Sequence, residues 1–205
     1  MSSPSSTSRR TPATEVRANL IRAGRVILER DGVAGLTVRT VAKEAGVAPM
    51  GVYNHFDGKD GLLDALVSDA YVEFGKAIGT TDDDPAQRLA HSGRAYRQFA
   101  LTYPVVYSMM FSSGCEPDPA AAGAAFEVLA DVVRYGQASG IIRAGEPHQL
   151  ALQIWSCVHG AVGIELAGAI PPFVEAAHNY ERVIELIARG LTPDTATAPG
   201  PTKAG

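Results

Sequence analysis

Apolar residues recur every three or four positions in the stretch TVRTVAKEA, residues 37–45, which indicates one buried face of a short helix. The residues on that face are Val38, Val41, Ala42 and Ala45. Gly46 and Val47 break the pattern, and a second short helix is expected over about residues 48–55. Two short helices joined by a tight turn that contains glycine are typical of a helix-turn-helix. Ala42 is small enough for a close crossing of the two helices, and the second helix is then free to enter the major groove of DNA.

Two residue pairs farther along the chain, Asp84-Pro85 and Asp118-Pro119, combine a helix-capping side chain with a proline, and each marks the start of a helix. Another helix is expected to begin around Glu146-Pro147. With the glycines and remaining prolines as boundaries, helices are expected at about 59–78, 85–103, 104–113, 119–140, 147–168 and 171–190. An earlier helix ends at Asp31-Gly32 and has an apolar face formed by Val16, Leu20, Ala23 and Ile27. Since no stretch shows sustained strand-like alternation, the sequence predicts an all-α protein of about nine helices.

Composition separates the two ends of the chain from its helical part. Residues 1–13 are rich in Ser, Thr and Pro, and residues 192–205 in Pro, Thr, Ala and Gly, so both tails are expected to be disordered. Arg9 and Arg10 either reach the DNA backbone or minor groove, or belong to an inert solvated tail. Between the tails we expect two helical domains, over residues 14–75 and 76–191.

Charge is distributed unevenly along the 205 residues. Residues 1–60 carry nine Arg or Lys and six Asp or Glu, a net charge of +3, whereas the remainder carries nine and sixteen, a net charge of −7. A basic N-terminal part joined to an acidic C-terminal part suits a protein that approaches DNA with its N-terminal end. The charge of +3 is modest and does not by itself establish DNA binding.

No sequence pattern typical of an enzyme or of a cofactor site is present. A glycine-rich phosphate loop, a nucleophile elbow and a zinc signature are all missing, and the five histidines lack metal-ligand spacing. Helix capping and solvation explain the acidic run Asp82–Asp84. Cys115 and Cys157 lie in apolar, helical stretches, which favours buried reduced thiols. Since these motifs are missing, no cofactor is expected. Because there is no signal peptide and no membrane-length apolar run, we expect a cytoplasmic protein without contact with membranes.

The string AGVAPMGVYNHFDGKDGLLDAL, residues 45–66, resembles the signature of the TetR family of bacterial transcriptional repressors. The resemblance rests on the tyrosine, histidine and phenylalanine of Tyr53–Phe56 and on Lys59, which opens a helix ahead of two leucines. The upstream helix and the Leu36-Thr37 entry to the next helix are similar as well, so the resemblance covers about residues 14–75. It implies a DNA-binding domain; the alternative is a structural helical hairpin without a DNA role.

Eight residues are candidate DNA contacts, from helix-turn-helix geometry and from positions that match the family motif. Thr37 caps the first helix, so its hydroxyl and the nearby amides can meet a phosphate. Arg39 is the candidate for a guanine contact, because the start of the second helix offers only apolar contact to bases. The resemblance implies phosphate contacts for Tyr53, His55 and Lys59. The full set is Thr37, Arg39, Pro49, Met50, Gly51, Tyr53, His55 and Lys59.

Small residues recur along one face of the helix expected at 147–168, namely Ser156, Gly160, Gly163 and Ala167. Two glycines inside a helix cost about 1 kcal/mol each relative to alanine, which makes sense where a second helix approaches closely. The final helix offers a matching apolar row of Phe173, Ala177, Tyr180, Ile184, Ile187 and Leu191. The two faces either form a four-helix dimer interface or pack within one subunit. The dimer interface is assigned to Ser156, Gly160, Gly163, Ala167, Tyr180, Ile184 and Ile187.

The Trp155, His159 and Gly160 pattern, with FALTYPVVYSMMF upstream, is similar to a TetR-family subclass known for its Trp-His-Gly motif. The resemblance implies a regulatory ligand-binding domain and names no effector. The aromatic and thioether side chains of this domain either line a pocket, in which Tyr103, Tyr107 and His159 supply polar groups for a ligand, or are ordinary core residues. The candidate lining residues are Phe99, Tyr103, Tyr107, Met110, Phe111, Phe126, Trp155 and His159.

The predicted function is a ligand-responsive transcriptional repressor. It is expected to bind a pseudo-palindromic double-stranded DNA operator as a homodimer and to be released by a small effector. The effector is expected to be mostly apolar, because no cluster of Arg or Lys falls among the candidate lining residues. The alternative is an all-α small-molecule-binding protein or enzyme that has kept a vestigial DNA-reading domain.

Overall fold

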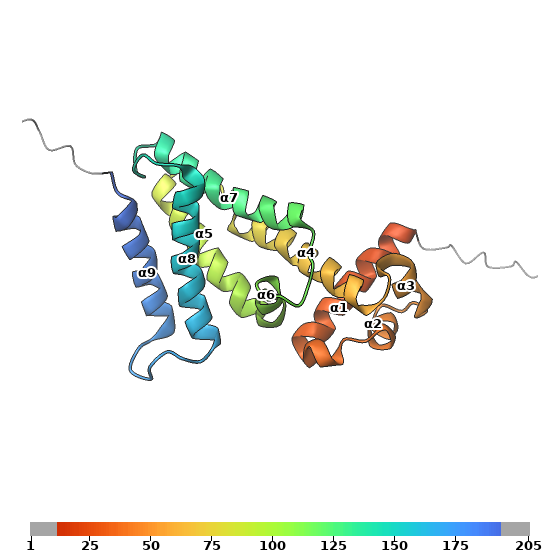
Figure 1. Ribbon diagram of the computed structural model, residues 1–205. Coiled ribbons are helices and arrows are strands. Elements are labelled where there is room, and N and C mark those ends of the chain that lie inside the picture. The colour runs from red at the N-terminus through yellow and green to blue at the C-terminus, as the bar shows by residue number, and fades with distance from the viewer. Residues whose placement is uncertain (1–11, 194–205) are drawn as a thin grey trace, which may run out of the picture. The chain divides into compact units, whose positions relative to one another are not determined.

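The computed structural model describes residues 12–193 (Figure 1). Those residues form nine helices and no strand, which confirms the predicted all-α fold. The helices are α1 (Ala13–Gly35), α2 (Val38–Glu44), α3 (Met50–Phe56), α4 (Lys59–Ile78), α5 (Pro85–Thr102), α6 (Pro104–Met110), α7 (Pro119–Ala138), α8 (Pro147–Leu166) and α9 (Ala176–Leu191). Arg9 and Arg10 lie outside the described residues, so their role stays a prediction.

The chain divides into two compact units. Among residues 12–193, the first unit contains residues 12–73 together with Tyr103–Ala122, and the second contains Phe74–Thr102 together with residues 123–193. Helix α6 packs against α1 in the first unit. The segment 103–122 therefore belongs with the helix-turn-helix, whereas the sequence placed it in the second domain.

The apolar face predicted for α1 is buried in the first unit. Leu20 and Ile27 are completely buried, and Gly24 leaves room for Leu66 of α4, because a Cβ atom added at Gly24 would lie 2.9 Å from Leu66 Cδ1. Gly32 has a φ of +68°, a conformation that glycine adopts without strain. It interrupts α1 at the point where the sequence predicted the helix to end.

Helix α2 has the cap that the sequence predicts, and α2 and α3 share a buried core. The Thr37 hydroxyl accepts a hydrogen bond from the Thr40 amide at 3.1 Å, and the Thr40 hydroxyl accepts one from the Thr37 amide at 2.9 Å. This reciprocal pair is a capping box. Helices α2 and α3 are in contact, and Val41, Ala42 and Val52 are at most 1% exposed, so all three belong to the core of the first unit.

In the second unit, α8 packs against α5 and α9. The start of α9 was predicted wrongly, because the helix begins at Ala176 and not at the proline pair near 171. The Glu175 carboxylate accepts hydrogen bonds from the amides of Ala177 and His178, and this cap fixes the first turn. Phe173, expected on the apolar face of the helix, lies before it and is 88% exposed.

Candidate functional site

Helix α3 turns one face to solvent and the other into the first unit. Met50 and Tyr53 are 63% and 55% exposed, whereas Val52 is completely buried. Of the other candidates on or next to this helix, Pro49 is exposed and Gly51 and His55 are half-buried. A short helix with exposed large side chains at its start can present them to the edges of bases in a major groove.

The candidate DNA contacts on α2 and α4 differ in how accessible they are to DNA. Thr37 and Arg39 of α2 are exposed and available to DNA. Lys59 is half-buried, and its Nζ donates a hydrogen bond to the Val33 carbonyl at the end of α1, at 3.4 Å. The ammonium of Lys59 would have to exchange this partner for a phosphate. Arg17 of α1 was not among the candidates, and its guanidinium carbon lies 5.1 Å from the centre of the Phe56 ring of α3.

The candidate ligand residues fall into two groups, one in each unit. The group in the first unit consists of Tyr103, Tyr107, Met110 and Phe111. Tyr107 and Met110 are buried, and the Phe111 ring lies 5.1 Å from the ring of Tyr107 and 6.2 Å from that of Tyr71. In this group the sequence missed Tyr71, whose hydroxyl donates to the Met110 carbonyl.

The group in the second unit consists of Phe99, Phe126, Trp155 and His159. A chain of hydrogen bonds runs through Tyr96, because the Trp155 indole donates to the Tyr96 hydroxyl at 3.0 Å and that hydroxyl lies 2.9 Å from His159 Nδ1. Burial lowers the pKa of His159, which favours the neutral imidazole. Tyr96 and Phe74, whose rings lie 5.0 Å apart, complete the group although the sequence did not single them out.

The small residues of α8 face solvent. Ser156, Gly160, Gly163 and Ala167 are exposed, and a Cβ atom added at either glycine would meet no atom within 4 Å. Three large apolar side chains on α8 and α9 are exposed as well, and they are Leu152, Ile164 and Leu186. This exposed apolar face of α8 and α9 is not used within the subunit.

Three residues assigned to the dimer interface are buried inside the subunit instead. Tyr180, Ile184 and Ile187 are 2%, 7% and 8% exposed. The Tyr180 hydroxyl donates to the carbonyl of Gly93 on α5 at 2.7 Å, and Ile184 lies against the same glycine. The assignment of these three residues to the interface is therefore wrong, because their side chains pack on α5 and α8. Helix α9 contributes Leu186 to the exposed face in their place.

Two family models match the chain. The model described as "Bacterial regulatory proteins, tetR family" matches residues 20–66, and "Tetracyclin repressor-like, C-terminal domain" matches residues 89–187. The chain belongs to the TetR family of transcriptional regulators. The first match contains the helix-turn-helix, and the second contains most of the second unit.

Individual relatives of this TetR-family regulator match either most of the chain or less than half of it. The HTH-type transcriptional regulator Rv0681 of Mycobacterium tuberculosis is 29% identical over 185 residues, which cover 86% of this chain and 82% of that protein. The tetracycline repressor protein class A from transposon 1721 of Escherichia coli is 37% identical over 92 residues, which cover 44% of this chain and 43% of that protein.

Solved structures share the fold of the TetR-family regulator. A protein of unknown function from Rhodococcus sp. RHA1 has a TM-score of 0.76 and 24% identity, with 92% of this chain and all of that chain covered. RolR, crystallised in complex with resorcinol, has a TM-score of 0.63 and 19% identity, with 90% of this chain and 91% of that chain covered.

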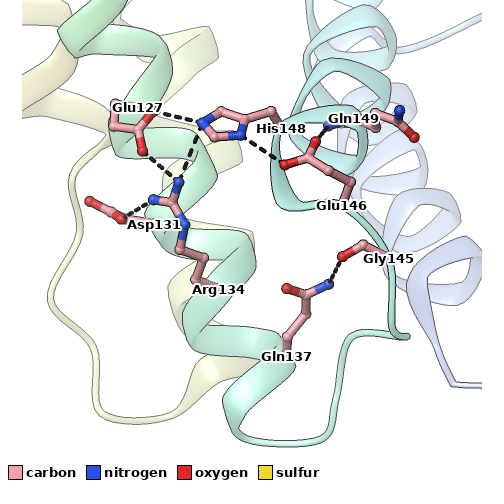
Figure 2. A network of polar contacts seen from close by, with 8 residues as sticks. All are labelled: Glu127, Asp131, Arg134, Gln137, Gly145, Glu146, His148 and Gln149. Atoms are coloured by element: carbon pink, nitrogen blue, oxygen red, sulfur yellow. Dashed lines mark hydrogen bonds and ion pairs between the residues drawn. The ribbon is translucent and has the colours of Figure 1, made fainter.

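A polar network joins α7 to the start of α8 in the second unit of the TetR-family regulator (Figure 2). His148 Nδ1 lies 2.9 Å from a Glu146 oxygen, and its Nε2 lies 2.9 Å from a Glu127 oxygen. These hydrogen bonds raise the pKa of His148, with the bond to Glu146 as the largest cause. Arg134 pairs with Glu127 and Asp131, and its bond to Glu127 is the main reason why the pKa of that carboxyl is lowered.

The acidic run at 82–84 and the two cysteines of the TetR-family regulator have structural explanations. Asp84 caps α5 by accepting hydrogen bonds from the amides of residues 86 and 87, and the Asp82 carboxylate pairs with His91 at 2.9 Å. Within residues 12–193, no group of three metal-ligating side chains comes together. Both thiols are free, but the prediction of burial is wrong for Cys157, which is exposed because its side of α8 faces solvent. Burial raises the pKa of the half-buried Cys115 thiol.

None of the helices in the described part of the chain is both long and apolar enough to cross a membrane.

Proposed function

We propose that this TetR-family protein is a ligand-responsive repressor, which binds a pseudo-palindromic operator as a homodimer in the cytoplasm and is released by a small molecule. The observation that carries the proposal is the exposed face of α3, where Met50 and Tyr53 are available while the helix is held by the buried Val52. The capped start of α2, with Thr37 and Arg39 exposed, supports the same role.

Electrophoretic retardation tests DNA binding directly. The full chain is mixed with the DNA upstream of its own gene, and with random DNA of equal length, over a range of salt concentrations. Retardation of the upstream fragment at salt concentrations that release random DNA is the expected result. If no genomic fragment is specifically retarded at low salt, the alternative of an all-α small-molecule-binding protein or enzyme with a vestigial DNA-reading domain is favoured.

The homodimer in this proposal uses the exposed apolar face of α8 and α9. The supporting observations are that Gly160 and Gly163 have open space above them and that Ile164 of α8 and Leu186 of α9 are exposed. Exposed glycines inside a helix cost stability and are explained where a second helix must approach closely. Sedimentation of the full chain at several concentrations is expected to show a dimer, and a monomer at all concentrations would contradict this part of the proposal.

The effector in this proposal is a mostly apolar small molecule that binds among the aromatic residues of the second unit, with Tyr96 and His159 as polar partners. Trp155 is the only tryptophan of the chain and its indole is hydrogen-bonded within this group. Its fluorescence is therefore a direct signal for binding. A true effector should change Trp155 fluorescence and release operator DNA over the same concentration range, whereas release without any change in fluorescence would place the effector elsewhere.

A further inference from the structure

Helix α6 is held at both ends by side chains from other helices of the first unit. Tyr103, the residue at its N-cap, forms no capping hydrogen bond with its side chain. Instead, the Glu29 carboxylate of α1 accepts hydrogen bonds from the amides of Val105 at 3.2 Å and Val106 at 3.0 Å. At the other end, the Tyr71 hydroxyl of α4 donates to the last carbonyl of α6. The position of α6 therefore depends on α1 and α4.

Arg25 lies one turn before Glu29 on α1, and only some of its hydrogen-bond donors have an acceptor. Its Nη1 pairs with Glu73 and lies 3.5 Å from Asp69, both on α4, and its guanidinium carbon lies 4.8 Å from the centre of the Tyr103 ring. The side chain is 12% exposed, and its Nε and Nη2 atoms are buried without a hydrogen-bond partner among the described residues. Buried donors without acceptors are unfavourable and are rare in folded proteins.

Glu29 is the natural acceptor for these two donors. Side chains four residues apart on a helix are neighbours, and the Nε and Nη2 edge of a guanidinium matches the two oxygens of a carboxylate. Within residues 12–193, however, the ion pairs of Arg25 are with Asp69 and Glu73, and Glu29 is occupied by α6. One carboxylate thus has two competing partners, and the structure shows it with the amides of α6.

We propose that Glu29 is a positioning residue that exchanges between the first-turn amides of α6 and the Nε and Nη2 edge of Arg25. When α6 is docked, Glu29 caps it and Arg25 has two unsatisfied donors. When α6 moves away, Glu29 turns to Arg25, and the new ion pair offsets the loss of the cap. In this proposal the two arrangements are close in free energy, so α1, which supports the helix-turn-helix, responds to the position of α6. The regulatory meaning of this exchange rests on the proposed function, but the exchange itself does not.

Hydrogen exchange at the Val105 and Val106 amides of the full chain, without DNA or effector, tests the proposal. Glu29→Ala removes the cap, so exchange should become about fivefold faster, the value that corresponds to about 1 kcal/mol for a lost cap. Arg25→Met removes the second partner of Glu29 and keeps a thioether against the Tyr103 ring, so exchange should become slower. Glu73→Gln frees Arg25 from its ion pair with α4 and should make exchange faster.

A passive cap and an exchanging one give different results in this experiment. If Glu29 is only a cap, Arg25→Met and Glu73→Gln leave exchange at both amides unchanged, and that result would overturn the proposal. In the exchanging case, Glu29→Ala also abolishes the effect of Arg25→Met in the double variant. If Arg25→Met fails to fold, Glu73→Gln still decides, because the Glu73 side chain is 47% exposed and its substitution disturbs no core.

An internal control excludes a general loss of stability. The first-turn amides of α9 are also capped by a glutamate, Glu175, and lie in the second unit. Their exchange should stay unchanged in all three single variants. Since the measurement uses no DNA, a negative result leaves the proposed DNA binding untouched, and a failed retardation experiment leaves the exchange result untouched.

Discussion

The hydroxyl oxygen of Tyr96 lies 2.9 Å from Nδ1 of His159, and the indole of Trp155 donates to the same oxygen. Since that oxygen already accepts from Trp155, its own proton is suited to point at an unprotonated Nδ1. This arrangement and the burial that lowers the pKa of His159 favour the same neutral imidazole.

The lowered pKa of His159 predicts a loss of stability in acid. A histidine whose pKa is lower in the folded than in the unfolded chain contributes stability above the unfolded value of about 6.5, and this contribution is lost as the pH falls through the folded value. Urea unfolding from about pH 8 to about pH 5 should therefore show a steeper loss for the natural chain than for His159→Gln. Parallel curves for the two proteins would mean that His159 does not titrate differently in the folded state.

His148 should affect stability in the opposite direction. Its pKa is raised by hydrogen bonds to Glu146 and Glu127, so its contribution is complete below about pH 6.5 and is lost as the pH rises through the folded value. The difference in stability between the natural chain and His148→Gln should shrink as the pH rises. Glu146→Gln removes the largest cause of the raised pKa of His148, so the difference in stability between the natural chain and Glu146→Gln should also shrink as the pH rises. If both differences stay constant with pH, the prediction is wrong.

Arg39 should determine the base preference at one base pair in each half of the operator. The start of α3 offers Pro49, Met50 and Gly51, none of which has a side chain that forms hydrogen bonds to a base. A guanine contact from Arg39 is therefore expected to supply about 1–3 kcal/mol of discrimination at one position. In a selection from randomised DNA, Arg39→Ala should relax that position and spare the others.

Apolar contact from Met50, which is 63% exposed, should be directed at thymine methyl groups beside that guanine. Uracil in place of the flanking thymines should weaken binding of the natural chain more than binding of Met50→Ala. Several strongly preferred G·C pairs that persist in Arg39→Ala would contradict the whole scheme.

Gly163→Leu should separate the proposed dimer without harming the subunit. A Cβ atom at Gly163 meets nothing within 4 Å, so the larger side chain fits the single chain and obstructs only an approaching helix. Sedimentation should show monomers, and operator affinity should fall sharply, because two half-sites about 34–36 Å apart need two linked helix-turn-helix domains.

Gly123→Leu is the matched control for that experiment. Gly123 is also exposed on a helix and also has open space above it, but it lies on α7. It should leave the dimer intact. A stable dimer that carries Gly163→Leu would remove this face of α8 from the interface.

The sequence located most helices because the hydrogen bonds that start a helix join residues close together in the chain. The pairs Asp84-Pro85, Asp118-Pro119 and Glu146-Pro147 stand at the starts of α5, α7 and α8, where a capping side chain and its amides are two or three residues apart. The start of α9 was missed because the proline pair gave a stronger pattern than Glu175, which is the residue that caps the helix.

Interactions between distant parts of the chain could not be predicted in this way. The attachment of α6 to α1 and α4 depends on bonds from Glu29 and Tyr71 to main-chain atoms, which carry no sequence pattern. Tyr180 and its neighbours on α9 were correctly recognised as an apolar row, but periodicity shows that a face is buried and not what covers it. Here α5 and α8 of the same subunit cover it.

The division of the first unit into two separate stretches of chain affects how such regulators can be recombined. A hybrid made by joining another protein's first 75 residues to this chain would keep α6 but replace the Glu29 that caps it. The exchanged piece would then have to supply its own acceptor for the Val105 and Val106 amides. Exchange of DNA specificity between relatives should succeed most often when residues 103–122 travel together with the helix-turn-helix, even though some thirty residues of the other unit separate them in the gene.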